Sequence, residues 1–121
     1  MYLRRILIIV YLLNILLVDD EKDTLRIIQK YFESKGAHVS AYSQPLLALQ
    51  DFIKNQNNKD VYYDLVISDI KMPEMNGIEL ASIIRKMNKE ISIIFMTASD
   101  MIDINNSILK FLNRESVIAN L

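Results

Sequence analysis

The 121-residue chain contains no cysteine and no tryptophan, and its one histidine is His38. The absence of cysteine excludes disulfides, thiolate nucleophiles, zinc knuckles and iron–sulfur clusters. A single histidine excludes a metal centre built from several histidines and argues against a Ser-His-Asp triad. Lysine and arginine total 14 against 15 acids, so no basic excess drives binding to nucleic-acid phosphates. Any chemistry must therefore be carried by carboxylates, hydroxyls and lysines.

Glycine and proline are also scarce, with two of each, so each one is expected to mark a required turn or helix end. Of all residues, 51% are apolar and 24% charged, which is the balance of a soluble globular protein. A chain of this length has room for one domain.

The amino-terminal segment is almost entirely apolar. Two arginines precede an apolar run at residues 6–13, and a second run follows at 15–18. A membrane helix needs about 20 apolar residues, and two acids follow at once, so neither a membrane span nor a cleaved signal peptide is expected. We interpret 15–18 as a buried strand and 1–13 as an extension. Three interpretations of this extension stay open: an ill-packed arm or extra strand, a product of an upstream start site, or a membrane-surface anchor. The extension is expected to promote self-association.

Helical and strand patterns alternate along the rest of the chain. Helices are predicted over residues 21–35, from Pro45 into the polar stretch 55–60, and over 78–88 and 100–113, with strands at 15–18, 37–42, 64–69, 91–96 and 116–121. Three of these strands are continuously apolar, which is typical of parallel strands buried on both faces. The pattern predicts a doubly wound α/β sandwich around a parallel sheet.

Two residues are expected to start helices by capping them. Asp20 is the predicted cap of the first helix, and Ser43 that of the second, which has Pro45 in its first turn. Four apolar residues of this second helix are expected to face the core: Leu46, Leu49, Phe52 and Ile53.

Acids and a hydroxyl follow the three apolar strands. Asp19 and Asp20 come after the first, Asp69 ends the next, and Thr97 follows residues 91–96. The carboxyl ends of parallel strands share one edge, where ligands bind, so these groups are expected to converge. One acid there could merely cap a helix, but three close carboxylates repel one another unless a cation neutralises them. Oxygen ligands alone favour Mg²⁺, beside which a carboxylate can accept a phosphoryl group.

Three stretches carry a resemblance to a known family: ILLVDDEKD at 15–23, DLVISDIKMPEMNGIEL at 64–80 and IIFMTA at 93–98. The chain resembles the receiver domain of two-component response regulators, the CheY-like fold. The central stretch is the most specific, since it joins an apolar strand, an aspartate, Met-Pro and Asn-Gly before a helix. The resemblance implies a flavodoxin-like, five-stranded parallel sheet in the order 2-1-3-4-5. Residues 14–121 would form the domain, which is expected to lack the family's fifth helix.

Position by position, the resemblance implies that Asp69 is the phosphoacceptor. Asp19 and Asp20 match the acid pair that holds Mg²⁺, joined by Asp69 and by the backbone carbonyl of Lys71. Thr97 corresponds to the switch hydroxyl that bonds the phosphoryl oxygen. The implied donor is a sensor histidine kinase or a phosphotransfer protein, in the cytoplasm, and the implied output is contact with a downstream protein rather than with nucleic acid. Such a chain is a phosphoacceptor and not an enzyme in the usual sense.

The chain departs from the family pattern near its carboxyl end. The position of the family's phosphoryl-contacting lysine falls on Ala119, and that of its aromatic switch residue on Ser116. Three explanations stay open: a truncated or altered carboxyl terminus, a pseudo-receiver that binds partners without phosphorylation, or phosphorylation that persists without the lysine. A phosphatase of the haloacid-dehalogenase type is disfavoured because it needs Asp-x-Asp, whereas Asp19 and Asp20 are adjacent.

Overall fold

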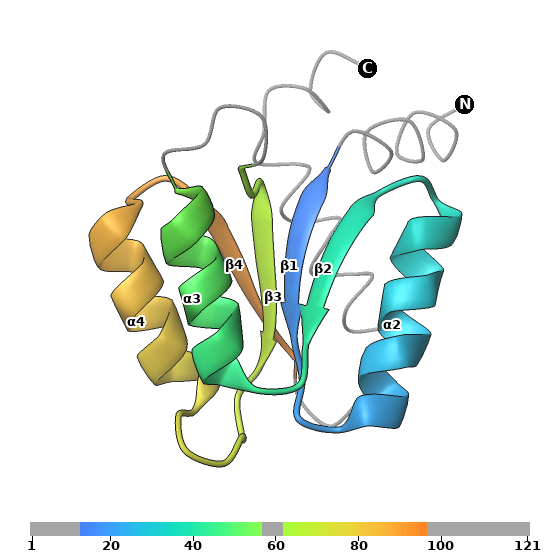
Figure 1. The fold of residues 1–121 in the computed structure, drawn as a ribbon, viewed down its shortest axis with the longest axis horizontal. Coiled ribbons are helices and arrows are strands. Elements are labelled where there is room, and N and C mark those ends of the chain that lie inside the picture. The colour runs from blue at the N-terminus through green and yellow to red at the C-terminus, as the bar shows by residue number, and fades with distance from the viewer. Residues whose placement is uncertain (1–12, 57–61, 97–121) are drawn as a thin grey trace.

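A parallel sheet forms the middle layer of the molecule (Figure 1). The computed structural model describes residues 13–56 and 62–96. Their strands lie in the order β2-β1-β3-β4: β1 (Asn14–Val18), β2 (His38–Tyr42), β3 (Leu65–Asp69) and β4 (Ser92–Met96). Every neighbouring pair is parallel, so the predicted fold class is confirmed for these strands. The strand predicted at 116–121, the helix at 100–113 and the expected loss of a fifth helix lie outside the described residues.

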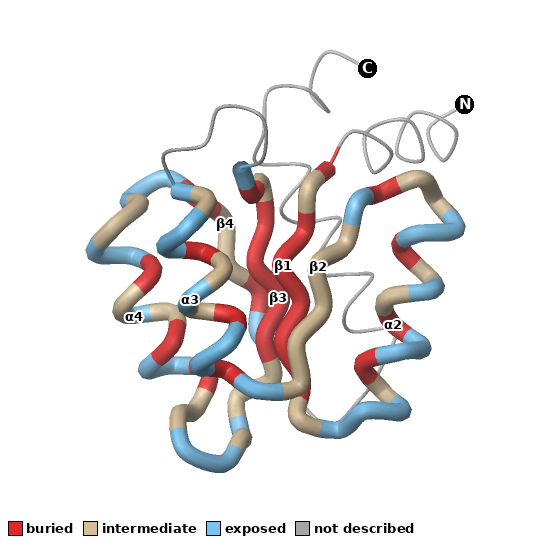
Figure 2. Tube along the Cα trace, in the orientation of Figure 1, coloured by how far each residue is buried: buried red, intermediate tan, exposed pale blue. Residues whose placement is uncertain are grey.

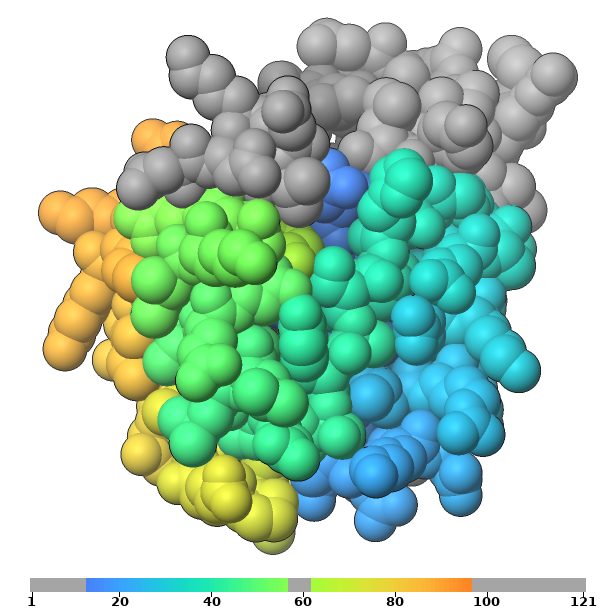
Figure 3. All heavy atoms as spheres, in the orientation of Figure 1, coloured from blue at the N-terminus to red at the C-terminus, as the bar shows by residue number. Residues whose placement is uncertain are grey.

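Three helices cover the two faces of this sheet. One face packs against α2 (Lys22–Ser34), and the other packs against α3 (Pro45–Asn55) and α4 (Gly77–Met87) (Figure 1). The space-filling view shows α3 at the surface of the molecule (Figure 3). None of the helices in the described residues is long and apolar enough to cross a membrane.

Alternate residues of the central strands face opposite layers of the core. Ile15 and Leu17 of β1 pack with α2, whereas Leu16 and Val18 pack with α3 and α4. The strands β1 and β3 are buried nearly throughout (Figure 2), which explains their unbroken apolar sequences. The strand β2 pairs only with β1 among the described strands, and His38 at its start is exposed.

The two predicted helix caps are wrong. The N-cap of α2 is Glu21 rather than Asp20, and the N–H of Glu21 donates to Asp19 Oδ1 at 3.0 Å. The N-cap of α3 is Gln44 rather than Ser43, and its side chain makes no capping hydrogen bond. In both cases the helix begins one residue later than predicted. Pro45 occupies the first turn of α3, and the Asp19 side chain holds the turn before α2 by accepting from the N–H of Glu21.

The buried stripe of α3 also differs from the prediction. Leu46 and Ile53 are 44% and 51% exposed, whereas the fully buried positions are Pro45, Ala48 and Phe52. These three are spaced by three and four residues and so share one helix face. Of the other predicted core residues, Phe52 is buried, and Leu49 is partly buried against the same cluster.

Candidate metal centre

Three carboxylates meet at the carboxyl ends of β1 and β3. Asp19 and Asp20 directly follow β1, and Asp69 is the last residue of β3. One oxygen from each lies within 4.8 Å of the others. We call this group (Asp19, Asp20 and Asp69) the acid edge; it lies at the lower edge of the sheet in Figure 1. The convergence follows from the parallel pairing of β1 with β3, which brings their carboxyl ends together.

The electrostatic environment of the acid edge disfavours its negative charge. Asp19 is only 3% exposed, and burial is the main reason that its pKa rises from 3.8 to about 6. The backbone N–H of Glu21 opposes that rise, while Asp69, Asp20 and Glu21 add to it by repulsion. Among the described residues, the charged groups that shift this pKa are all acidic, so a cation bound there would offset both the desolvation of the Asp19 carboxylate and the repulsion between the acids.

The donor set of the acid edge fits a magnesium ion. Mg²⁺ prefers oxygen ligands, and it is commonly held by one or two carboxylates together with water and phosphate oxygens. Asp20 and Asp69 are partly exposed, so their carboxylates reach solvent while Asp19 anchors the site from within. The backbone carbonyl of Lys71, two residues past Asp69, stays a predicted ligand.

The loop after β3 turns back closely against the acid edge. A Cβ on Gly77 would lie 2.1 Å from the carbonyl oxygen of Asp69, so only glycine fits there. The N–H of Gly77 also donates to the carbonyl of Ile70 at 2.8 Å. Glu74, inside the loop, has a φ of 70°, in the left-handed region. Glycine is therefore required at position 77 because the backbone of Asp69 leaves no room for a side chain.

The helix that follows the loop has a complete capping box. The Asn76 side chain accepts from the N–H of Glu79 at 2.8 Å, and the Glu79 carboxylate accepts from the N–H of Asn76. This box fixes the start of α4, and with it the position of Gly77, against β3.

Three residues named from the sequence for the site lie outside the described residues: Thr97, Ser116 and Ala119. The strand that leads to Thr97 ends beside the acid edge, because Met96 is the register partner of Asp69. The roles of these residues stay predictions, as does that of the extension 1–13, of which residues 1–12 lie outside the described residues.

The structure also contains a hydrogen-bonded cluster around one carboxylate, that of Asp51, which the sequence did not predict. Asp51 of α3 accepts hydrogen bonds from the Tyr42 hydroxyl on Oδ2, and on Oδ1 from the Tyr63 hydroxyl at 2.6 Å and Asn55 Nδ2 at 2.8 Å. We call these four residues the Asp51 cluster. Burial alone would raise the pKa of Asp51, but the three donors together lower it. Only the Asp51–Asn55 pair has a helical spacing, and nothing in the sequence indicates the two tyrosine contacts.

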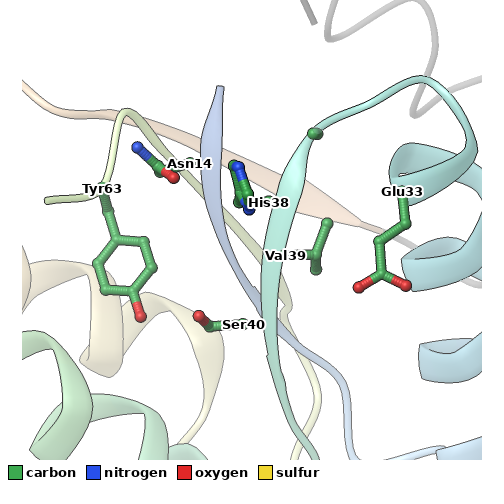
Figure 4. A pocket seen from close by; sticks show the side chains of 7 residues that line it. Asn14, Glu33, His38, Val39, Ser40 and Tyr63 are labelled. Atoms are coloured by element: carbon green, nitrogen blue, oxygen red, sulfur yellow. The ribbon is translucent and has the colours of Figure 1, made fainter. Parts of the chain in front are cut away.

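A hollow of about 420 Å³ lies at the opposite end of the sheet (Figure 4). Asn14 and His38, the first residues of β1 and β2, line it together with Glu33 and Tyr63. Because it lies at the amino ends of these strands, it is separate from the acid edge.

Comparison with known proteins assigns this geometry to a family. The family model described as the response regulator receiver domain matches residues 15–114. The transcriptional regulatory protein RprY of Bacteroides fragilis is 34% identical over 89 residues, covering 74% of this chain and 35% of RprY. The chain thus spans about a third of the length of this relative.

Two solved structures share the fold and carry informative partners. The response regulator TrrA of Thermotoga maritima in complex with Mg²⁺ and BeF superposes with a TM-score of 0.63 at 34% identity, covering 72% of this chain and 70% of TrrA. TrrA in complex with the histidine kinase ThkA gives a TM-score of 0.61 at 35% identity, covering 74% and 77%. The sheet order, the matched sequence and these neighbours agree, and the chain belongs to the response regulator receiver domains of two-component systems.

Proposed function

We propose that this chain is a phosphoacceptor, modified on Asp69 in a magnesium-dependent reaction. The observation that carries the proposal is the acid edge: three carboxylates from adjacent strands within 4.8 Å in a receiver-domain fold. Asp69 ends its strand partly exposed, so a donor can reach its oxygens. Burial of Asp19 keeps its carboxylate in place behind them.

The magnesium ion would be held by Asp19, Asp20, Asp69 and the carbonyl of Lys71. Support comes from the donor set itself and from TrrA, whose structure was solved with Mg²⁺ and BeF. When bound, the ion supplies positive charge that neutralises the oxygens of the transferred group.

The residues of the chain carry the transfer. An Asp69 oxygen forms a bond to phosphorus while the bond from phosphorus to the donor's imidazole nitrogen breaks, and that electron pair leaves with the imidazole. The product is an acyl phosphate, which replaces one negative charge by about two at the acid edge. In this proposal the Thr97 hydroxyl then bonds a phosphoryl oxygen.

The donor in this proposal is a histidine kinase or a phosphotransfer protein of the cytoplasm. The complex of ThkA with TrrA supports a kinase partner, because TrrA shares 35% identity with this chain. The proposed output is contact with a downstream protein.

Phosphorylation from a small donor tests the proposal. The full chain is incubated with acetyl phosphate with and without MgCl₂, and the Asp69→Asn variant serves as an isosteric control. Intact mass spectrometry is expected to show one added phosphoryl group on the wild type with Mg²⁺ and none on the variant. A wild-type chain that stays unmodified with Mg²⁺ contradicts the proposal.

One alternative function has a specific observation in its favour. By the family's usual spacing from Thr97, the position of its lysine falls on Ala119, and the loss of this lysine would fit a pseudo-receiver that binds partners without phosphorylation. In the same experiment a pseudo-receiver gives no modification, whereas a chain that works without this lysine is modified on Asp69.

A further inference from the structure

The backbone of Asp19 is held by the last residue of the neighbouring strand. The Asp19 N–H donates to the carbonyl of Tyr42 at 3.1 Å, which extends the β1–β2 ladder past the register pair of Val18 with Tyr42. The Tyr42 backbone therefore helps to fix the Asp19 backbone, together with the β1–β3 pairing, and with it the short aspartate side chain.

Tyr42 is anchored through its side chain as well as through the sheet. Its hydroxyl donates to Asp51 Oδ2 on α3, and the other oxygen of Asp51 accepts from Tyr63 and Asn55. Both carboxylate oxygens are thus occupied by donors from three separate segments. Hydrogen bonds to an ionised acceptor are about twice as strong as neutral ones, so this anchor holds Tyr42 firmly.

We propose that Tyr42 and Asp51 are positioning residues for the magnesium ligand Asp19. Asp51 fixes the tyrosine side chain, and the tyrosine carbonyl fixes the Asp19 amide, although neither residue belongs to the acid edge. This inference rests on the proposed function, since it gives the Asp51 cluster a part in metal binding at the acid edge, which lies beside the carboxyl end of β2.

Tyr63 offers a matched control within the same cluster. Its hydroxyl bonds the same carboxylate at 2.6 Å, and it is more deeply buried than Tyr42, with its ring stacked on Phe52. However, Tyr63 precedes the start of β3 at Leu65, whereas Asp69 lies at the far end of that strand. Loss of its hydroxyl therefore removes one donor from Asp51 and a contact with Ser40 of β2, while the hydroxyl of Tyr42 keeps its own bond to Asp51.

Calorimetric titration of the metal-free chain with MgCl₂ tests the inference. Changes to residues that support a metal ligand from outside the ligand shell typically weaken metal binding by about tenfold or more. We expect Tyr42→Phe to raise the magnesium Kd by a smaller factor, about fivefold, because the backbone bond from Asp19 to Tyr42 remains. Tyr63→Phe is expected to leave the Kd within about twofold of the wild type. A purely structural cluster would instead weaken binding equally in both variants, and that result overturns the inference.

Amide hydrogen exchange of the metal-free chain gives a second readout. The Asp19 amide is expected to exchange faster in Tyr42→Phe than in the wild type, relative to the Val66 amide of β3, and to be unchanged in Tyr63→Phe. Unchanged exchange at Asp19 in Tyr42→Phe overturns the inference. A wild-type chain that binds no Mg²⁺ refutes the proposed function, and the exchange experiment then still decides whether Tyr42 fixes Asp19.

Discussion

Two carboxylates of this protein lie in opposite settings. Asp19 is almost fully buried among other acids, and its pKa rises to about 6, mainly because of burial. Asp51 is also desolvated, but three side-chain donors hold its pKa below the usual range. Burial therefore does not decide the charge of a carboxylate by itself; the groups around it do. A carboxylate that accepts several hydrogen bonds joins neighbouring helices and strands, whereas a carboxylate with few donors is available to bind a cation.

The largest expected effect is loss of the Asp51 carboxylate. Asp51→Ala leaves the hydroxyls of Tyr42 and Tyr63 without their acceptor, so we expect the free energy of unfolding to fall by about 3–5 kcal/mol. Urea denaturation of the metal-free chain measures it. The control Asp23→Ala removes an exposed acid of the first turn of α2 and should cost less than about 1 kcal/mol. Equal losses in the two variants would contradict the structural role of Asp51.

The pH dependence of stability should separate the two carboxylates. The folded-state pKa of Asp19, about 6, exceeds its unfolded value of 3.8, so its contribution is complete below pH 3.8 and disappears as pH rises through 6. This loss amounts to about 3 kcal/mol at most. The lowered pKa of Asp51 acts oppositely: its contribution is present above pH 3.8 and is lost as pH falls.

This difference is checked by measuring the free energy of unfolding of the metal-free chain between pH 4 and pH 7. The wild type should lose stability toward pH 7, and Asp19→Asn, which cannot ionise, should largely flatten the curve. Saturating MgCl₂ should restore the wild type at pH 7. If the unfolding free energy of the wild type depended as little on pH as that of Asp19→Asn, this would contradict the claim that the ionised Asp19 carboxylate destabilises the metal-free fold.

A smaller effect is expected where the backbone crowds the acid edge. Gly77→Ala places a methyl group 2.1 Å from the Asp69 carbonyl, so we expect a loss of about 2 kcal/mol and a weaker magnesium affinity. Gly36→Ala is the control, because its φ of 94° also penalises alanine, by about 1 kcal/mol, but far from Asp69. Denaturation and magnesium titration of both variants check this. An unchanged magnesium affinity in Gly77→Ala would contradict the importance of this contact.

The smallest expected effect is a gain. Glu74 adopts a left-handed conformation in the loop after β3, which glycine adopts without strain. We expect Glu74→Gly to stabilise the chain by about 0.5 kcal/mol, since relief of strain exceeds the added entropy of the unfolded chain. Urea denaturation measures the change, and a clear loss of stability would contradict it.

The sequence predicted the acid edge better than it predicted the details of the helices. Apolar runs identify β1 and β3 because strands buried on both faces need them, and parallel strands bring Asp19 and Asp69 to one edge. Helix caps depend on a choice between adjacent residues, so the predictions of Asp20 and Ser43 each missed by one position.

The Asp51 cluster could not be predicted from the sequence. Tyr42, Asp51 and Tyr63 belong to three different segments, and their contacts arise only when α3 packs against the sheet. The same holds for Gly77: a turn was predictable from its type, but its contact with the Asp69 carbonyl is a tertiary one. Sequence patterns therefore locate the ends of strands, whereas the residues that hold those ends in place require the structure.

Magnesium titration of the acid edge tests the central claim most directly. The metal-free wild type, Asp20→Asn and the exposed neighbour variant Glu21→Gln are titrated with MgCl₂ in a calorimeter. The account predicts one site on the wild type, binding at least about tenfold weaker in Asp20→Asn, and near wild-type binding in Glu21→Gln. Binding that is equally strong in Asp20→Asn, or absent from the wild type, would contradict it.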